Sequence, residues 1–108
     1  MTKAISNNKL PMPVGTILDC EWGWEQTNVD FYQVVRATAK SIWIRPIAHT
    51  RKEVAVDEYE VEPILGRFLD DNEKGELHRI NKSGYITMNS YSVATPYKGG
   101  SILETTYA

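Results

Sequence analysis

Short runs in which polar and apolar residues alternate are the feature that most constrains the fold of this chain. "VGTILDCEW" (14–22) alternates in this way, with Leu18 and Cys20 on one side of an extended strand. β-Branched and aromatic residues dominate "VDFYQVVRAT" (29–38) and "SIWIRPI" (41–47), which favours strands over helices. Turn residues recur about every eight to twelve positions. This pattern predicts an all-β domain.

The rest of the chain continues the pattern. "VAVDEYEVEPI" (54–64) is expected to form a fourth strand, with a short helical turn around "VDEYE" as the alternative, and "SILETTYA" (101–108) a last strand. "LHRI" (77–80) and "YITMNSYSV" (85–93) flank the turn "NKSG", so they are expected to pair as a hairpin. We therefore expect a small antiparallel, partly open SH3-like barrel of about five to seven strands with a C-terminal hairpin.

Length and composition predict one soluble domain. The 108 residues are 42% apolar and 24% charged, which suits a single folded core. Residues 1–13 are polar and end in "LPMP", so we expect a flexible arm there and the domain over 14–108. Neither a secretory leader nor a membrane-spanning run is expected, and the single Cys20 fits a reducing compartment, the cytoplasm.

Charge disfavours two kinds of function. A net charge of −2 neither attracts phosphate backbones nor imitates DNA. Basic residues nevertheless gather between Arg36 and Lys52, and acidic ones between Glu53 and Glu62. If these segments form neighbouring strands, their charges largely neutralise one another; otherwise the molecule has a basic face.

"WGWEQTNVDFYQVV" (22–35) places polar amides between aromatic rings. Its side chains are expected to bond the backbone of a turn and present the two Trp rings, which would flank a groove or cap one end of the core. Direct contact with a ligand is the alternative. The candidate binding residues here are Trp22, Trp24, Gln26, Asn28 and Asp30.

An aromatic and basic face is the second candidate site. If Phe31 and Val35 point into the core, Tyr32, Val34 and Arg36 point outward. On the next strand Ile42 and Ile44 suit the core, so Trp43 and Arg45 point outward. Rings beside arginines suit stacking on bases or holding a peptide. The alternative is that Trp43 packs beneath the C-terminal hairpin. The proposed outer face comprises Tyr32, Arg36, Trp43 and Arg45.

The stretch "WGWEQTNVDFYQVV" also resembles a motif in a set of short proteins encoded mostly by bacteriophages and other mobile elements. "KSIWIRPI", "GYITMNSYS" and the ending "TTYA" resemble further parts of that pattern, over roughly residues 14–47 and 83–108. Trp24 departs from the Tyr expected there, and "TPYKGGSILE" lacks the aromatic-Asp-Gly turn. The resemblance implies origin and shape, with no settled activity and no catalytic residue.

Catalytic and metal-binding patterns are absent from the sequence. His49 and His78 have no metal-ligand spacing around them, and Cys20 inside an alternating strand is expected to be a buried, inert thiol. We expect neither a cofactor nor a metal. The acids Asp19, Glu21, Glu25 and Asp30 would be the best enzymatic case, by binding a cation or transferring protons.

Three hypotheses follow, in order of preference. The first is a non-enzymatic phage or mobile-element accessory protein that binds a host protein or nucleoprotein, with inhibition of a defence system as one concrete form. The second is a nucleic-acid-binding barrel that uses the outer face, and an enzyme comes third. A free edge near Pro46 or at the last strand would support a homodimer by strand addition.

Overall fold

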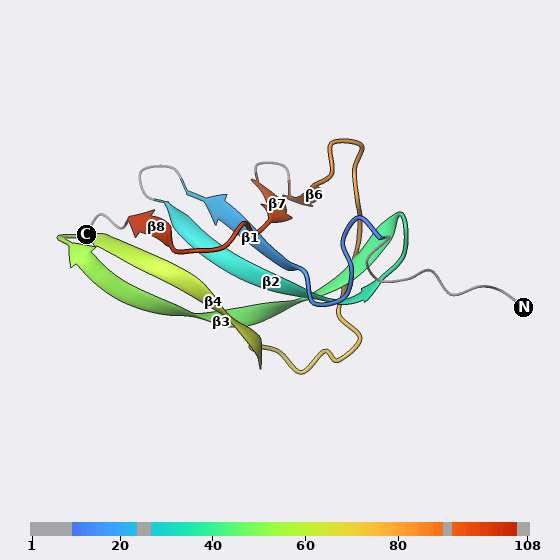
Figure 1. The fold of residues 1–108 in the computed structure, drawn as a ribbon, viewed down its shortest axis with the longest axis horizontal. Coiled ribbons are helices and arrows are strands. Elements are labelled where there is room, and N and C mark those ends of the chain that lie inside the picture. Colours follow the sequence, from blue (N-terminus) through green and yellow to red (C-terminus); the bar gives the residue numbers. More distant parts are fainter. Residues whose placement is uncertain (1–9, 24–26, 90–91, 106–108) are drawn as a thin grey trace, which may run out of the picture.

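A computed structural model describes residues 10–23, 27–89 and 92–105. These residues form one open antiparallel sheet in the order β6-β7-β1-β2-β3-β4-β8, with β5 paired to β3, and contain no helix (Figure 1). The all-β expectation is confirmed, and the eight strands exceed the expected range. Their bounds are β1 Ile17–Trp22, β2 Asn28–Ala37, β3 Ser41–Ala55, β4 Glu58–Phe68, β5 Glu76–Arg79, β6 Ile86–Asn89, β7 Ser92–Pro96 and β8 Ile102–Thr105.

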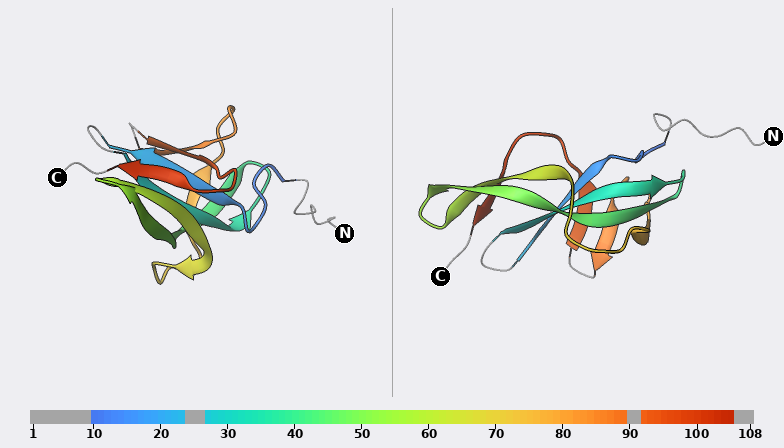
Figure 2. Two further views of the ribbon diagram at one scale, coloured as in Figure 1. Left: turned by 60° about the vertical axis from the view of Figure 1, so that its left-hand side comes forward. Right: turned by 90° about the horizontal axis from the view of Figure 1, so that it is seen from below.

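The long hairpin of β3 and β4 corrects the strand predicted over 54–64. β3 continues to Ala55 and the chain reverses at Val56 and Asp57, where Asp57 has a φ of 60°. Asp is one of the few residues besides glycine that adopt this left-handed conformation readily. The tip of the hairpin projects from the rest of the sheet, with β8 beside it (Figures 1 and 2).

A β-bulge in β2 determines which side chains point inward. Val34 lies opposite Ile44 and Arg36 opposite Trp43, so Val35 is an extra residue in the ladder. Val34 is fully buried, whereas Val35 is only partly buried. The expectation that Val35 faces the core and Val34 faces outward is therefore wrong. Val34 projects from the same face as Tyr32, where residues of β1, β3, β6 and β7 bury it, and Val35 is the bulge residue.

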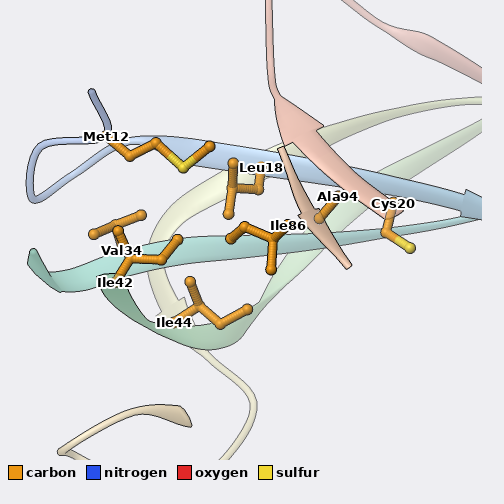
Figure 3. Close-up of a cluster of buried hydrophobic side chains, with 8 residues drawn as sticks. All are labelled: Met12, Leu18, Cys20, Val34, Ile42, Ile44, Ile86 and Ala94. Atoms are coloured by element: carbon orange, nitrogen blue, oxygen red, sulfur yellow. The ribbon is translucent and has the colours of Figure 1, made fainter. Parts of the chain in front are cut away.

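The first core lies on one face of β1, β2 and β3, where the β6–β7 hairpin covers it. Figure 3 shows the side chains converging from these strands. Met12 is 1% exposed and belongs to this core, so the packed domain begins before the expected boundary at Val14. Residues 1–9 of the expected arm lie outside the described residues. The first core comprises Met12, Leu18, Cys20, Val34, Ile42, Ile44, Ile86 and Ala94.

The second core lies on the opposite face of β2. Phe31 and Tyr32 are consecutive, and Phe31 belongs to the second core while Tyr32 packs against the first. The Phe31 ring contacts the Tyr97 ring edge-on, with centroids 5.7 Å apart. The second core comprises Ile17, Val29, Phe31, Ile47 and Val61, with Phe68, Tyr97 and Ile102 packed against it.

The predicted hairpin of 77–80 with 85–93 is wrong. β5 pairs with β3, placing Leu77 opposite Trp43, whereas β6 pairs with β7. The turn expected at 81–84 does form, since the Gly84 amide donates to the Asn81 carbonyl. The C-terminal hairpin is therefore the β6–β7 pair, and β5 instead extends the sheet beside the start of β3.

β8 partly closes the sheet around the second core. It pairs with β4, and its Thr105 amide donates to the Thr27 carbonyl at the start of β2. The Glu104 carboxylate, 8% exposed, accepts hydrogen bonds from the Val29 amide at 3.0 Å and the Arg51 guanidinium at 3.1 Å. A side chain thus supplies the acceptor that a neighbouring strand would otherwise give to Val29.

Candidate functional site

Three side chains form a line across β2, β3 and β5. Arg36 lies opposite Trp43, and Trp43 lies opposite Leu77. Residues directly opposite in antiparallel strands project from the same face, so these three side chains are neighbours. The Arg36 guanidinium lies over the Trp43 ring, 4.6 Å from its centroid, and Leu77 is 56% exposed. We name Arg36, Trp43 and Leu77 the Arg–Trp–Leu row.

A second line of residues runs beside the row. Ser41 lies opposite Arg79. Arg79 is two residues after Leu77 on β5, so its side chain projects from the same face as the row. Arg79 is exposed. The row is therefore an aromatic and aliphatic surface bordered by positive charge.

The bulge in β2 brings Arg36 to Trp43. Without the extra residue, the alternation that buries Val34 would put Arg36 on the same face as Val34, in the first core. After the bulge, Arg36 shares the face of Trp43 and its guanidinium stacks on the indole. This contact restricts the rotamers of an exposed arginine, whose guanidinium carries hydrogen-bond donors.

Arg45 is bound within the chain and is not an exposed binding residue. Its side chain is 11% exposed, donates to the Asp70 carboxylate at 2.9 Å and to the Asp70 carbonyl at 2.8 Å, and stacks 3.9 Å from the Phe68 ring centroid. These contacts fasten the segment after β4 to the sheet. Arg45 shares the face of Trp43, as expected, but its hydrogen-bonding groups are engaged within the chain.

Tyr32 does not belong to the predicted outer face. It packs against the first core, on the side of β2 opposite Phe31. Burial, together with the nearby Asp30 carboxylate, raises the pKa of Tyr32 to about 12. The sequence-based error has the same cause as that at Val34, because the β6–β7 hairpin covers the face that was expected to be the outer one.

The segment between β4 and β5 packs against the base of the row. A Cβ at Gly75 would lie 3.1 Å from the Trp43 Cβ and 2.9 Å from Val35 Cγ2. Gly75 also has a φ of +78°, which side-chain-bearing residues rarely adopt. Glycine therefore lets the chain pass close to Trp43 before β5 begins and places Leu77 beside the indole.

The candidate residues of the opening motif have separate positions. The Trp22 indole, 43% exposed, donates to the Asp30 carboxylate at 2.7 Å. Asn28 is partly buried and lies opposite Trp22 in the ladder. Asp30 thus orients a Trp side chain, in line with a structural role, although it bonds an indole rather than the backbone of the turn. Trp24 and Gln26 lie outside the described residues.

The predicted acidic cluster is divided between faces. Asp19 and Glu21 border a cleft of about 300 Å³ together with Tyr97 and Lys98, whereas Asp30 projects from the other face of the sheet. Burial and the nearby Glu21 raise the pKa of Asp19. Glu25 lies outside the described residues. Within the described ranges, no group of three or more His, Cys, Asp and Glu side chains is arranged to hold a metal ion.

The basic segment 36–52 and the acidic segment 53–62 lie on neighbouring strands, which is the first of the two alternatives given for their charges. Lys52 lies opposite Glu60, and Arg51 pairs with Glu104 while its guanidinium covers the Tyr59 ring. The positive charge of this part of β3 is therefore largely compensated. Arg36 in the row and Arg79 beside it have no carboxylate within ion-pair distance among the described residues.

Leu77 and Arg79 are the site residues that sequence reasoning missed. The alternation in "ELHRI" does place both on one side of a strand. The predicted pairing with 85–93 assigned that strand to the wrong neighbour, so neither residue was connected with Trp43. Recognising them requires the register of β5 on β3.

No protein-family model, curated protein or solved structure matches the chain. Along the described part of the chain, no helix has the length and apolar character needed to cross a membrane. The candidate site therefore rests on the geometry of the row itself.

Proposed function

We propose that this chain is a non-enzymatic accessory protein of a bacteriophage or similar mobile element, and that it binds a host protein through the Arg–Trp–Leu row. The resemblance of "WGWEQTNVDFYQVV" to a phage-associated motif supports the origin. Inhibition of a host defence system in the cytoplasm is one concrete form of this activity.

One observation carries the proposal: Arg36 stacks on Trp43 beside the exposed Leu77. Trp and Arg are the residues most enriched among those that dominate protein–protein binding energies, because they combine large contact areas with directed polar groups. The stack also reduces the side-chain freedom that Arg36 would lose on binding. Its surroundings are basic, which favours an acidic patch on the partner.

Affinity capture from a bacterial lysate tests this function. The tagged protein, its Trp43→Ala variant and its Trp22→Ala variant are compared, with and without nuclease, and recovered proteins are quantified by mass spectrometry. Trp22 is the matched control, because it is also an exposed Trp but projects from the opposite face of the sheet, at the end of β1.

We expect a specific protein that survives nuclease, is retained by Trp22→Ala and falls about tenfold or more with Trp43→Ala. Thermal unfolding verifies that both variants are folded. Equal recovery by the two variants would refute binding through the row.

A second candidate is nucleic-acid binding by the same row, because Arg36, Arg79 and the Trp43 ring combine phosphate-binding groups with a stacking surface. It has less support, since Tyr32 lies on the other face and Arg45 is engaged by Asp70. Recovery that disappears with nuclease, together with salt-dependent oligonucleotide binding lost in Trp43→Ala, would establish it instead.

A further inference from the structure

We propose that the outer edge of β5 takes up an extended acidic segment of the partner as an added antiparallel strand. This inference rests on the proposed function and specifies the chemistry of the partner. β5 pairs with β3 on one side, and the turn after it leads to β6, which pairs with β7. Its other edge therefore has no strand partner among the described residues.

The pattern of hydrogen bonds between β5 and β3 shows which backbone amide and carbonyl groups of β5 point to that edge. The Ile80 amide donates to the Lys40 carbonyl, so 40 and 80 form a hydrogen-bonded pair, and the alternation makes Ile42 and His78 another. Leu77 and Arg79 thus direct their amide and carbonyl groups away from β3. No bond from another described residue meets these groups.

An added strand at this edge would extend the site. A residue opposite Leu77 would continue the line of the Arg–Trp–Leu row, and a residue opposite Arg79 would project on the same face. Leu77 favours an apolar or aromatic neighbour, whereas Arg79 favours a carboxylate. Because the strand is antiparallel, the partner sequence would read acidic, any residue, then aromatic.

Charge supports this occupant. Arg36 within the row and Arg79 beside it are exposed cations, and the acids of β4 compensate positive charge farther along β3 instead. Glu76 forms its contact with His78 on the opposite face of β5. A basic or neutral strand would gain backbone hydrogen bonds but would place no opposite charge beside Arg79.

Synthetic peptides test the proposal without the natural partner. The parent probe is acetyl-Thr-Glu-Val-Phe-Thr-amide, titrated into the ¹⁵N-labelled protein while the Leu77 and Arg79 amides are observed by NMR. We expect these two amides to shift most, with binding in the range of about 1 mM or tighter.

Backbone methylation separates strand addition from side-chain contact. In the expected register the Glu and Phe amides of the peptide face β5, whereas the Val amide faces solvent. N-methylation of the peptide Phe should weaken binding about tenfold, and N-methylation of Val should leave it nearly unchanged. Equal effects of the two methylations, or no shift at Leu77 and Arg79, would overturn the proposal.

A charge exchange tests the acidic preference. Replacing the peptide Glu by Lys should weaken binding, and the Arg79→Glu protein should restore it for the Lys peptide. Failure of this rescue would overturn the acidic assignment. Shifts at Leu77 and Arg79 that depend on protein concentration without peptide would show a second copy at this edge, which also overturns it.

The two proposals fail in different experiments. If Trp43→Ala abolishes capture of a host protein while peptide methylation has no effect, binding through the row stands and strand addition fails. If Trp43→Ala leaves capture intact, the proposed function fails, and the peptide titration still reports on the β5 edge by itself.

Discussion

Glu104 accepts a hydrogen bond from the backbone amide of Val29, which precedes it by 75 residues. The same carboxylate holds Arg51, so one side chain joins β8, β2 and β3 at the margin of the second core. Removing it would leave a buried amide without an acceptor and a guanidinium without its ion pair.

We therefore expect Glu104→Ala to lower the free energy of unfolding by about 2–4 kcal/mol. Glu104→Gln should cost less, since its amide oxygen can still accept from Val29. Urea unfolding measures both, with Glu60→Ala as the control because Glu60 is exposed on β4. A Glu104→Ala effect no larger than that of the control would contradict the role assigned to this carboxylate.

Tyr32 should make the fold sensitive to alkaline pH. Its pKa rises from 10.0 to about 12 on folding, so between these values the folded state keeps a proton that the unfolded state releases. Stability contributed below pH 10 is therefore lost as the pH rises toward 12. The unfolding midpoint should fall more steeply over this range for the native chain than for Tyr32→Phe; parallel curves would argue against the burial of the phenol.

Truncation of Arg45 should destabilise the fold more than truncation of Arg36. Arg45→Ala removes the contacts with Asp70 and Phe68, so we expect a loss of about 2–3 kcal/mol and faster amide exchange over residues 69–75. Arg36→Ala should cost only about 0.5–1 kcal/mol, because that arginine is exposed. The idea of Arg45 as an anchor would not survive unchanged exchange rates in this segment.

Gly75→Ala should be more destabilising than Gly84→Ala. Both glycines have a positive φ, but a Cβ at Gly75 meets Val35, Trp43 and the Ile44 carbonyl oxygen, whereas one at Gly84 has no neighbour within 4 Å. We expect a cost of about 2–4 kcal/mol at Gly75 and about 1 kcal/mol at Gly84. Equal losses in thermal unfolding would show that the segment before β5 can move away from Trp43.

Local pattern predicted most of the strands but not their arrangement. Alternation identified β1, β2 and the first part of β3, because a period of two depends only on the residues themselves. The bulge at Val35 and the pairing of β5 with β3 depend on contacts between distant segments. The bulge moved Arg36 to the face opposite Val34, and the wrong neighbour predicted for β5 separated Leu77 from Trp43.

The candidate site was predictable only in part. Sequence indicated Arg36 and Trp43, since an arginine and an aromatic residue on successive strands are a local signal. Glu104 gave no such signal, because an acid in "ILETT" reads equally well as an exposed residue of an edge strand. Its burial follows from the approach of β8 to the start of β2, which only the complete register reveals.

β2 contributes Phe31 to one core and Val34 to the other, and only two residues separate them. Neither half of the molecule can lose this strand without exposing apolar side chains of the other half. We therefore expect the two small cores to be thermodynamically coupled and to unfold as a single cooperative unit. A partner that binds the folded sheet at the Arg–Trp–Leu row would accordingly slow amide exchange at residues as remote as Val29 and Val61.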